Sequence, residues 1–219
     1  MKLKKIASLA LAGIMAVSML TACGEGGSSS SEPTNPVTPV TGAASIVNNE
    51  LNSNKDNISF TDNSILTDLL TNFYKENPIE AGTWTAGNAK LVENEATKLW
   101  DAVIDLYDVD AKNNIDYASN RDWWVKSAGS KTFCNIYWIN NDFVTKDDAL
   151  RMVGQTMDNV TLPKDNYVKA DPAHSITEQK ATLDYTYTGS VAAIEAQSKG
   201  GTESVWVIAV TVTQTATNK

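Results

Sequence analysis

Cys134 and His174 are the two residues whose types most directly suggest catalysis, because a thiol with an imidazole is the minimum for a cysteine hydrolase. The sequence around Cys134 argues against this chemistry. It alternates like a strand and places the thiol on the same face as Ile136 and Trp138. An apolar setting raises the pKa of a thiol and makes it unreactive. We therefore predict that Cys134 is a core residue, and we assign no catalytic residue.

The chain contains one histidine, and this count limits its metal chemistry. Zinc sites that use two or three histidines cannot be built from it. Asp171 and Glu178 flank His174, but Pro172 lies between them and the set offers only one imidazole. We interpret His174 as a surface residue.

A polar loop that follows residue 107 resembles an EF-hand or dockerin-type calcium loop. The resemblance implies calcium ligands at loop positions one, three, seven and nine, which are occupied by Asp108, Asp110, Asn114 and Asp116. Three positions depart from the pattern: Lys112 replaces a carboxylate, Asn113 the turn glycine and Ser119 the bidentate acid. A solvated acidic loop is therefore the favoured interpretation. We expect no cofactor, with calcium as the alternative.

The chain is rich in large aromatic residues, with six tryptophans and seven tyrosines. Flat aromatic rings that are exposed can stack on the faces of sugars. Trp123 and Trp124, beside Arg121 and Asp122, are the best candidates for such a platform, and Trp84 in a Gly/Thr loop is the next. The alternative is that the tryptophans pack in the core or under loops.

The start of the chain has the composition of an export signal. Residues 1–22 contain three lysines near the start and then an uncharged run of signal-peptide length. The run ends in Leu20, Thr21, Ala22 and Cys23, which resemble the lipobox of bacterial lipoprotein precursors. The resemblance implies that residues 1–22 are removed and that the Cys23 thiol is diacylated. Two acyl chains make a stable anchor, since each buried methylene contributes about 0.8 kcal/mol.

Residues 23–43 have the composition of a disordered linker, with Gly and Ser first and Pro later. We expect them to hold a single domain, residues 44–219, away from the membrane. Removing the three lysines of residues 1–22 leaves 15 of the 18 basic residues against 26 acidic residues, a net charge of −11. Such a charge disfavours nucleic acid as a partner.

Helices are predicted mainly before the strands. Apolar residues at helical spacing predict helices over residues 44–51, 64–74 and 88–107, and a short one over residues 121–126. Asp62 or Asn63 can cap the second of these. Thr145 and Asp148 form a capping box that opens a further helix, which stops before Pro163.

The C-terminal part has the period of β-structure. Strands are predicted over residues 131–140, 182–188 and 191–199, and Gly200 and Gly201 turn the last of these into a strand over residues 204–213. That final run is apolar on both faces, so we place it in the middle of the sheet. The fold class is therefore α+β, with helices in the N-terminal half packed on a C-terminal antiparallel sheet.

These observations predict a membrane-anchored extracytoplasmic lipoprotein, for which binding of a ligand is favoured over catalysis. Its partners would be the membrane, through the lipid anchor, and a glycan or an envelope protein. The first alternative is a cell-envelope hydrolase that uses carboxylates alone, which would need two acids about 5–10 Å apart. The second alternative is a structural role in a surface complex.

Overall fold

Two long paired strands form the centre of the fold. The computed structural model describes residues 36–79, 92–93, 99, 102–103, 106, 125–168, 172–174, 177–198 and 200–219. Strands β5 (Leu183–Gln197) and β6 (Ser204–Asn218) are antiparallel and pair over 15 residues each. Gly200 and Gly201 between them have φ angles of 87° and 68°, which glycine adopts without steric cost. The predicted hairpin is therefore confirmed.

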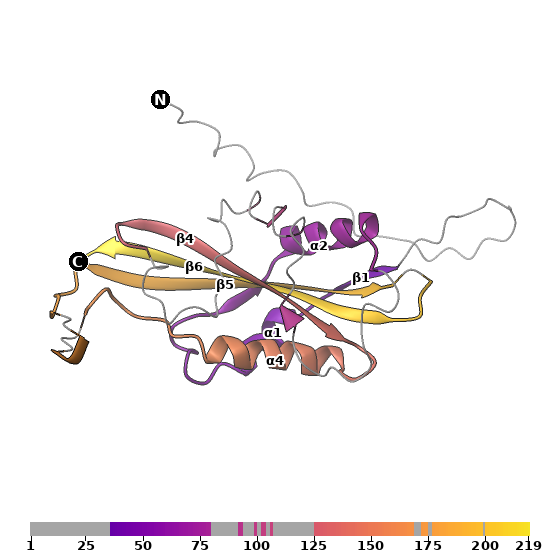
Figure 1. The fold of residues 1–219 in the computed structure, drawn as a ribbon, viewed down its shortest axis with the longest axis horizontal. Helices are drawn as coiled ribbons and strands as arrows, with labels where there is room; N and C mark the ends of the chain where they lie inside the picture. Colours follow the sequence, from indigo (N-terminus) through magenta and orange to yellow (C-terminus); the bar gives the residue numbers. More distant parts are fainter. Residues whose placement is uncertain are drawn as a thin grey trace, which may run out of the picture. The chain divides into compact units, whose positions relative to one another are not determined.

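Four more strands complete the sheet, which has the order β1-β5-β6-β4-β3 (Figure 1). The strand β4 (Gly129–Asn140) is antiparallel to β6 along its whole length. At the two edges, β1 (Val37–Val40) is antiparallel to β5 and β3 (Val92–Glu93) is antiparallel to β4. Strand β2 (Phe60–Asp62) pairs with β5 in the parallel direction. The central position predicted for residues 204–213 is confirmed.

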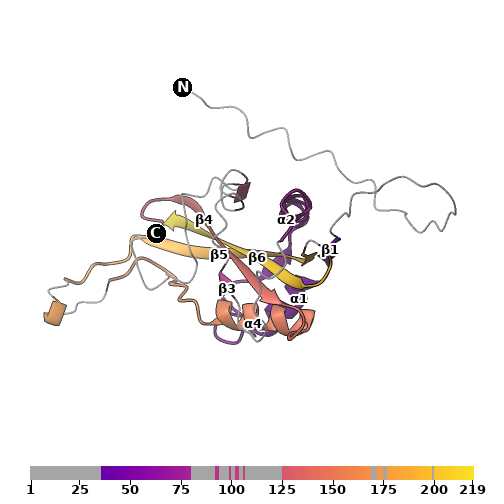
Figure 2. The same ribbon diagram turned by 45° about the vertical axis from the view of Figure 1, so that its right-hand side comes forward.

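Helices lie on both faces of this sheet. Figure 2 shows α2 (Ser64–Glu76) on one side of the strands and α1 (Ala43–Asn49) and α4 (Lys146–Asp158) on the other. Because successive side chains of a strand point to opposite faces, each of the three long strands contributes to two separate cores. The α1/α4 core contains Phe133, Val191 and Ile208, and the α2 core contains Ile136, Ile194 and Val207. The α+β prediction is confirmed.

The N-terminal caps of the two long helices follow the sequence. The Asn63 side chain accepts a hydrogen bond from the backbone N–H of Leu66 at 3.0 Å, which caps α2. At α4 the Thr145 hydroxyl accepts from the N–H of Asp148 at 3.2 Å. The Asp148 carboxylate accepts from the Thr145 hydroxyl at 2.7 Å, so the two side chains of the predicted capping box are in direct contact.

The predicted linker over residues 23–43 is wrong in its last part. Val37–Val40 form β1, α1 begins at Ala43, and the compact unit of the chain is Pro33–Lys219. Composition favoured disorder because this segment contains prolines. An edge strand tolerates Pro39, since alternate N–H groups of such a strand point away from the sheet.

The predicted helix over residues 88–107 is wrong at its start and confirmed further on. Val92–Glu93 are the strand β3, opposite Trp138 and Tyr137 of β4. Residues 99, 102–103 and 106 are helical, and Leu99 and Val103 are fully buried in the α2 core, as the apolar spacing predicted.

The two strands predicted over residues 182–188 and 191–199 are one strand. Gly189 lies in the gap between the two predicted strands, and the structure places it in the middle of β5. A Cβ atom at this position would lie 2.6 Å from the ring of Phe60, so the missing side chain makes room for Phe60 in the α1/α4 core. The glycine thus serves packing and not a turn.

The C-terminal end of α4 is fixed by a reciprocal contact with the loop after α1. The Asp158 carboxylate accepts hydrogen bonds from the N–H groups of Asn52, Ser53 and Asn54 at 2.7–3.0 Å. In return the buried Asn54 amide donates to the carbonyl oxygens of Met157, Asp158 and Val160. Desolvation raises the pKa of Asp158, but the backbone hydrogen bonds outweigh it and the pKa is lowered.

We predict that Asp158→Ala lowers the free energy of unfolding by about 2 kcal/mol, because three donors lose a charged acceptor. The pKa of Asp158 is lower in the folded state than in the unfolded state. Its contribution to stability is therefore complete at pH values above the unfolded-state pKa of about 3.9, and it is lost as the pH falls through the folded-state pKa. Urea unfolding at pH 7 and at pH 3 measures both effects. Asp68→Ala is the control, because Asp68 is exposed and has no hydrogen bond or ion pair within the described part of the chain. Equal losses for the two variants at pH 7 would contradict the prediction.

Candidate functional site

Several residues predicted from the sequence lie outside the described part of the chain. These are the tryptophans of the proposed aromatic platform and the four oxygen ligands of the calcium-like loop: Trp84, Trp123, Trp124, Asp108, Asp110, Asn114 and Asp116. Their roles therefore stay predictions. Among the residues that the structure does describe, no group of three or more His, Cys, Asp or Glu side chains could hold a metal ion.

Cys134 is a core residue, as predicted. Its side chain is 0% exposed and lies in the α2 core beside Ile136. Burial raises the pKa of the Cys134 thiol, so the group stays protonated. His174 ends a short 3-10 helix, Pro172–His174, far along the chain from the strand that carries Cys134.

The three long strands extend beyond the helices. A strand of 15 residues spans about 50 Å, whereas a helix of 13 residues such as α2 spans about 20 Å. In Figure 1, α2 covers one part of the sheet, and β4, β5 and β6 continue past it. Beyond this helix the strands carry hydroxyl side chains on the α2 side. We call this surface the hydroxyl face; it consists of Ser130, Thr132, Thr186, Thr188, Ser190, Thr211, Thr213, Thr215 and Thr217.

Hydrogen bonds between strands order these hydroxyl groups. Ser130 bonds to Thr215 at 2.9 Å, Thr132 to Thr213 at 2.8 Å, and Ser190 to Thr211 at 2.6 Å, each through the two side-chain oxygens. A pair of hydroxyls has two donors and four lone pairs, and their mutual bond uses one of each. The Ser130–Thr215 and Thr132–Thr213 pairs, which are not buried, therefore keep donor and acceptor capacity for a ligand.

The hydroxyl face is accessible to solvent. Ser130, Thr186, Thr188 and Thr217 are exposed, and Thr211 is buried. The remaining four members are half-buried. The Thr186 and Thr188 hydroxyls make no hydrogen bond to any part of the chain that the structure describes. None of the nine residues carries a charge, although 20% of the chain's residues do.

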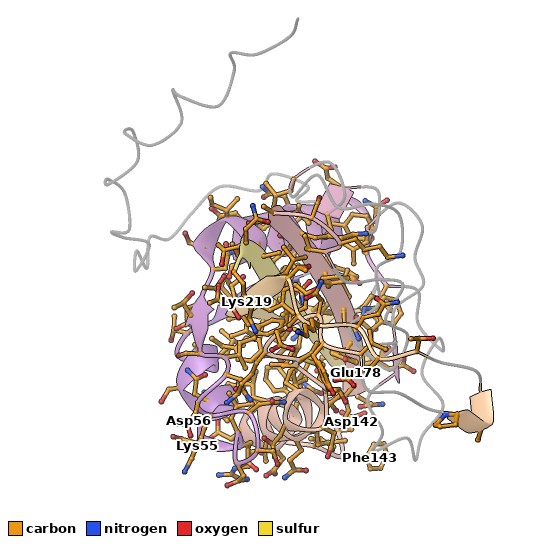
Figure 3. All side chains as sticks on the ribbon, turned by 90° about the vertical axis from the view of Figure 1, so that its left-hand side faces the viewer. Lys55, Asp56, Asp142, Phe143, Glu178 and Lys219 are labelled. Carbon is orange, nitrogen blue, oxygen red and sulfur yellow. The ribbon has the colours of Figure 1, made fainter. Side chains whose placement is uncertain are left out.

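Polar contacts mark both ends of the hydroxyl face. At the end next to α2, the Asn63 amide donates to the Ser190 hydroxyl at 3.1 Å. At the other end, Asp184 of β5 lies opposite Thr217 of β6. Its carboxylate oxygen is 3.3 Å from the Lys219 ammonium nitrogen. Figure 3 looks at this end of the sheet, with Lys219 labelled. The same ammonium lies 2.9 Å from the Asp165 carboxylate, so Lys219 bridges two acids at this end and only partly offsets their charge.

The opposite side of the same strands is buried and fixes a neighbouring segment. Gln214 is 0% exposed; its side-chain oxygen accepts from the Val125 N–H at 2.8 Å and its amide donates to the Tyr187 hydroxyl at 2.9 Å. The Tyr185 hydroxyl donates to the Val125 carbonyl at 2.9 Å. Both backbone groups of the residue that follows Trp124 are therefore held by the sheet. Val125 is not helical, so the short helix predicted over residues 121–126 does not include it.

The sequence contained part of the signal for the hydroxyl face. Threonine occupies every second position from Thr211 to Thr217, and also positions 186 and 188. Over residues 182–188 this alternation predicts a strand with one face toward solvent. It did not show that three such strands would place their hydroxyls side by side, because that depends on the pairing of β4 with β6 and of β6 with β5.

Comparisons of the chain with protein-family models, curated proteins and solved structures find no match. The structure contains no helix, among the residues it describes, that is long and apolar enough to cross a bilayer.

We predict that Cys134 is unreactive in the folded protein, because its thiol is buried and protonated. In a Cys23→Ala variant, where Cys134 is the only cysteine, iodoacetamide at pH 8 should label the native chain at least 100-fold more slowly than the chain unfolded in guanidinium chloride. Mass spectrometry measures both rates. If the native chain is labelled as fast as the unfolded chain, the thiol is accessible and reactive, and the prediction is wrong.

Proposed function

We propose that this chain is a lipoprotein that is anchored through Cys23 to the outer face of a membrane and binds an extracellular ligand through its α+β domain. The observation that carries the binding role is the hydroxyl face, an ordered and accessible surface of uncharged donors and acceptors. Neutral hydroxyls of this kind orient a ligand by hydrogen bonds. Acid–base catalysis needs groups with pKa values near the working pH, and threonine and serine lack them.

The position of β1 supports a short tether. Cys23 and Val37, the first residue of β1, are 14 residues apart. A fully extended chain of that length reaches about 50 Å at most. The domain would therefore work close to the membrane surface, where an envelope glycan or an envelope protein is within reach.

An aromatic contribution from Trp123 and Trp124 belongs to the same proposal, with Trp84 as the further candidate. The support comes from the residue that follows the pair, since Val125 is held on both backbone groups by Gln214 and Tyr185. A fixed attachment point lowers the entropy that an adjoining binding segment loses when it meets a ligand.

The anchor is tested by replacing its acylation site. We expect metabolic labelling with a palmitate analogue to mark the native chain, and Cys23→Ala to abolish the label and move the protein from the membrane fraction to the soluble fraction. Cys134→Ala is the matched control and should leave both labelling and fractionation unchanged. If the native chain stays unlabelled and Cys23→Ala fractionates as before, the anchor does not exist.

Calcium is tested separately. We propose that Asp108, Asp110, Asn114 and Asp116 form a solvated acidic loop, because Lys112 and Asn113 replace residues that a calcium loop needs. A calcium concentration of several millimolar should then leave the melting temperature unchanged relative to the same concentration of magnesium. A calcium-specific rise that Asp108→Asn abolishes would establish the site instead.

A further inference from the structure

We propose that the hydroxyl face, formed by β4, β6 and β5, binds a neutral polysaccharide whose chain extends over several of its rows. This inference rests on the binding role proposed above and names the ligand class and the residues. It follows from three properties of the surface: its charge, the hydrogen-bonding character of its side chains, and the regular spacing that the strand pairing imposes.

The charge of the surface selects an uncharged ligand. The nine residues of the hydroxyl face are all neutral, and the adjoining Asp184 contacts Lys219, which it shares with Asp165. A nucleic acid or an anionic envelope polymer would need lysine or arginine side chains at the contact, and the face has none. A cationic ligand would need unpaired carboxylates, which the face also does not provide.

The type of side chain favours sugars over protein. Protein interfaces are enriched in aromatic residues, methionine and arginine, and threonine and serine rarely dominate their binding energy. A mostly apolar partner would bury the hydroxyls without satisfying them, which costs free energy. A sugar hydroxyl both donates and accepts hydrogen bonds, as the threonine hydroxyl does. A polyhydroxylated ligand can therefore serve as donor or as acceptor for each hydroxyl of the face.

The register of the strands turns the hydroxyls into rows. Thr215 lies opposite Ser130 on one side and Thr186 on the other, and in the next row Thr213 lies opposite Thr132 and Thr188. Neighbouring strands are about 4.8 Å apart and successive rows about 6.8 Å apart. A ligand that repeats its hydroxyls along a chain can therefore contact several rows at once, whereas a single sugar meets only one.

The face is also preorganised for binding. Threonine is branched at Cβ and has a stiff χ1 angle. The hydroxyl pairs also fix two side chains in each of three successive rows, through hydrogen bonds of 2.6–2.9 Å. A ligand therefore orders few side chains when it binds. Single contacts of this kind are weak, so the affinity should rise with the length of the ligand and with the density of anchored copies.

The test is native affinity electrophoresis of the full-length protein in a polyoxyethylene detergent, which carries no sugar. The gels contain a neutral polymer (mixed-linkage β-glucan, xyloglucan or galactomannan) or the acidic polygalacturonate. We expect at least one neutral polymer to retard the protein and polygalacturonate to have no effect. Hexasaccharides of the active polymer should compete at least tenfold better than its monosaccharide.

The decisive variant is Thr186→Val, Thr188→Val and Thr213→Val combined, which removes three hydroxyls with little change of shape or strand propensity. We expect its dissociation constant for the polymer to rise at least tenfold, since the loss of each hydrogen bond raises that constant about threefold. The matched control is Thr38→Val, Thr161→Val and Thr202→Val combined, three exposed threonines outside the hydroxyl face. It should bind like the unmodified chain, and the melting temperatures of both variants should stay close to that of the unmodified chain.

Several results would overturn the inference. If the unmodified chain is retarded and the decisive variant is retarded equally, the ligand binds elsewhere, and the proposed binding role survives without this site. Retardation by polygalacturonate alone contradicts the neutral ligand. If no neutral polymer retards the chain, the face does not bind polysaccharide. A concentration-dependent dimer in sedimentation that the decisive variant abolishes would show that a second copy of the chain covers the face.

Discussion

The antiparallel ladder between β5 and β6 is the constraint on which the rest of the structure depends. It pairs 15 residues of each strand in one register, from Leu183 opposite Asn218 to Gln197 opposite Ser204. Both remaining edges are then used: β4 adds to β6, and β1 and β2 add to β5. A slip of one residue would exchange the two faces and expose both cores. The register therefore decides which side chains meet the helices and which meet water.

The length of these strands explains why one side of the sheet is apolar along one part and hydroxyl-rich along another. The helices are too short to cover strands of about 50 Å, so burial changes along each strand. On the α2 side, β6 carries Val205, Val207 and Ala209 where the helix covers it, and threonines from Thr211 onwards. Threonine suits this role because it has high β propensity and a polar surface. A surface of valine at the same positions would be an apolar patch that promotes aggregation.

Sequence patterns predicted the elements whose period is strong and local. The stripes of α2 and α4, the cap at Asn63 and the hairpin at Gly200 and Gly201 all follow from neighbours within a few residues. The errors came where tertiary contacts outweighed local signals. Pro39 lies in an edge strand because β5 offers its backbone, and Gly189 stays extended because Phe60 fills the space of its missing side chain.

The sequence by itself determined the α+β class, the acidity of the chain, the buried and inert character of Cys134, and the threonine at every second position from Thr211 to Thr217. Only the tertiary structure decided that Ser130, Thr213 and Thr188 belong to one surface, because residues of three strands became neighbours through backbone pairing across gaps of tens of residues. Local periodicity indicates toward which face of its strand or helix a side chain points. It contains no information about which strands lie next to each other, and the candidate site depends on that arrangement.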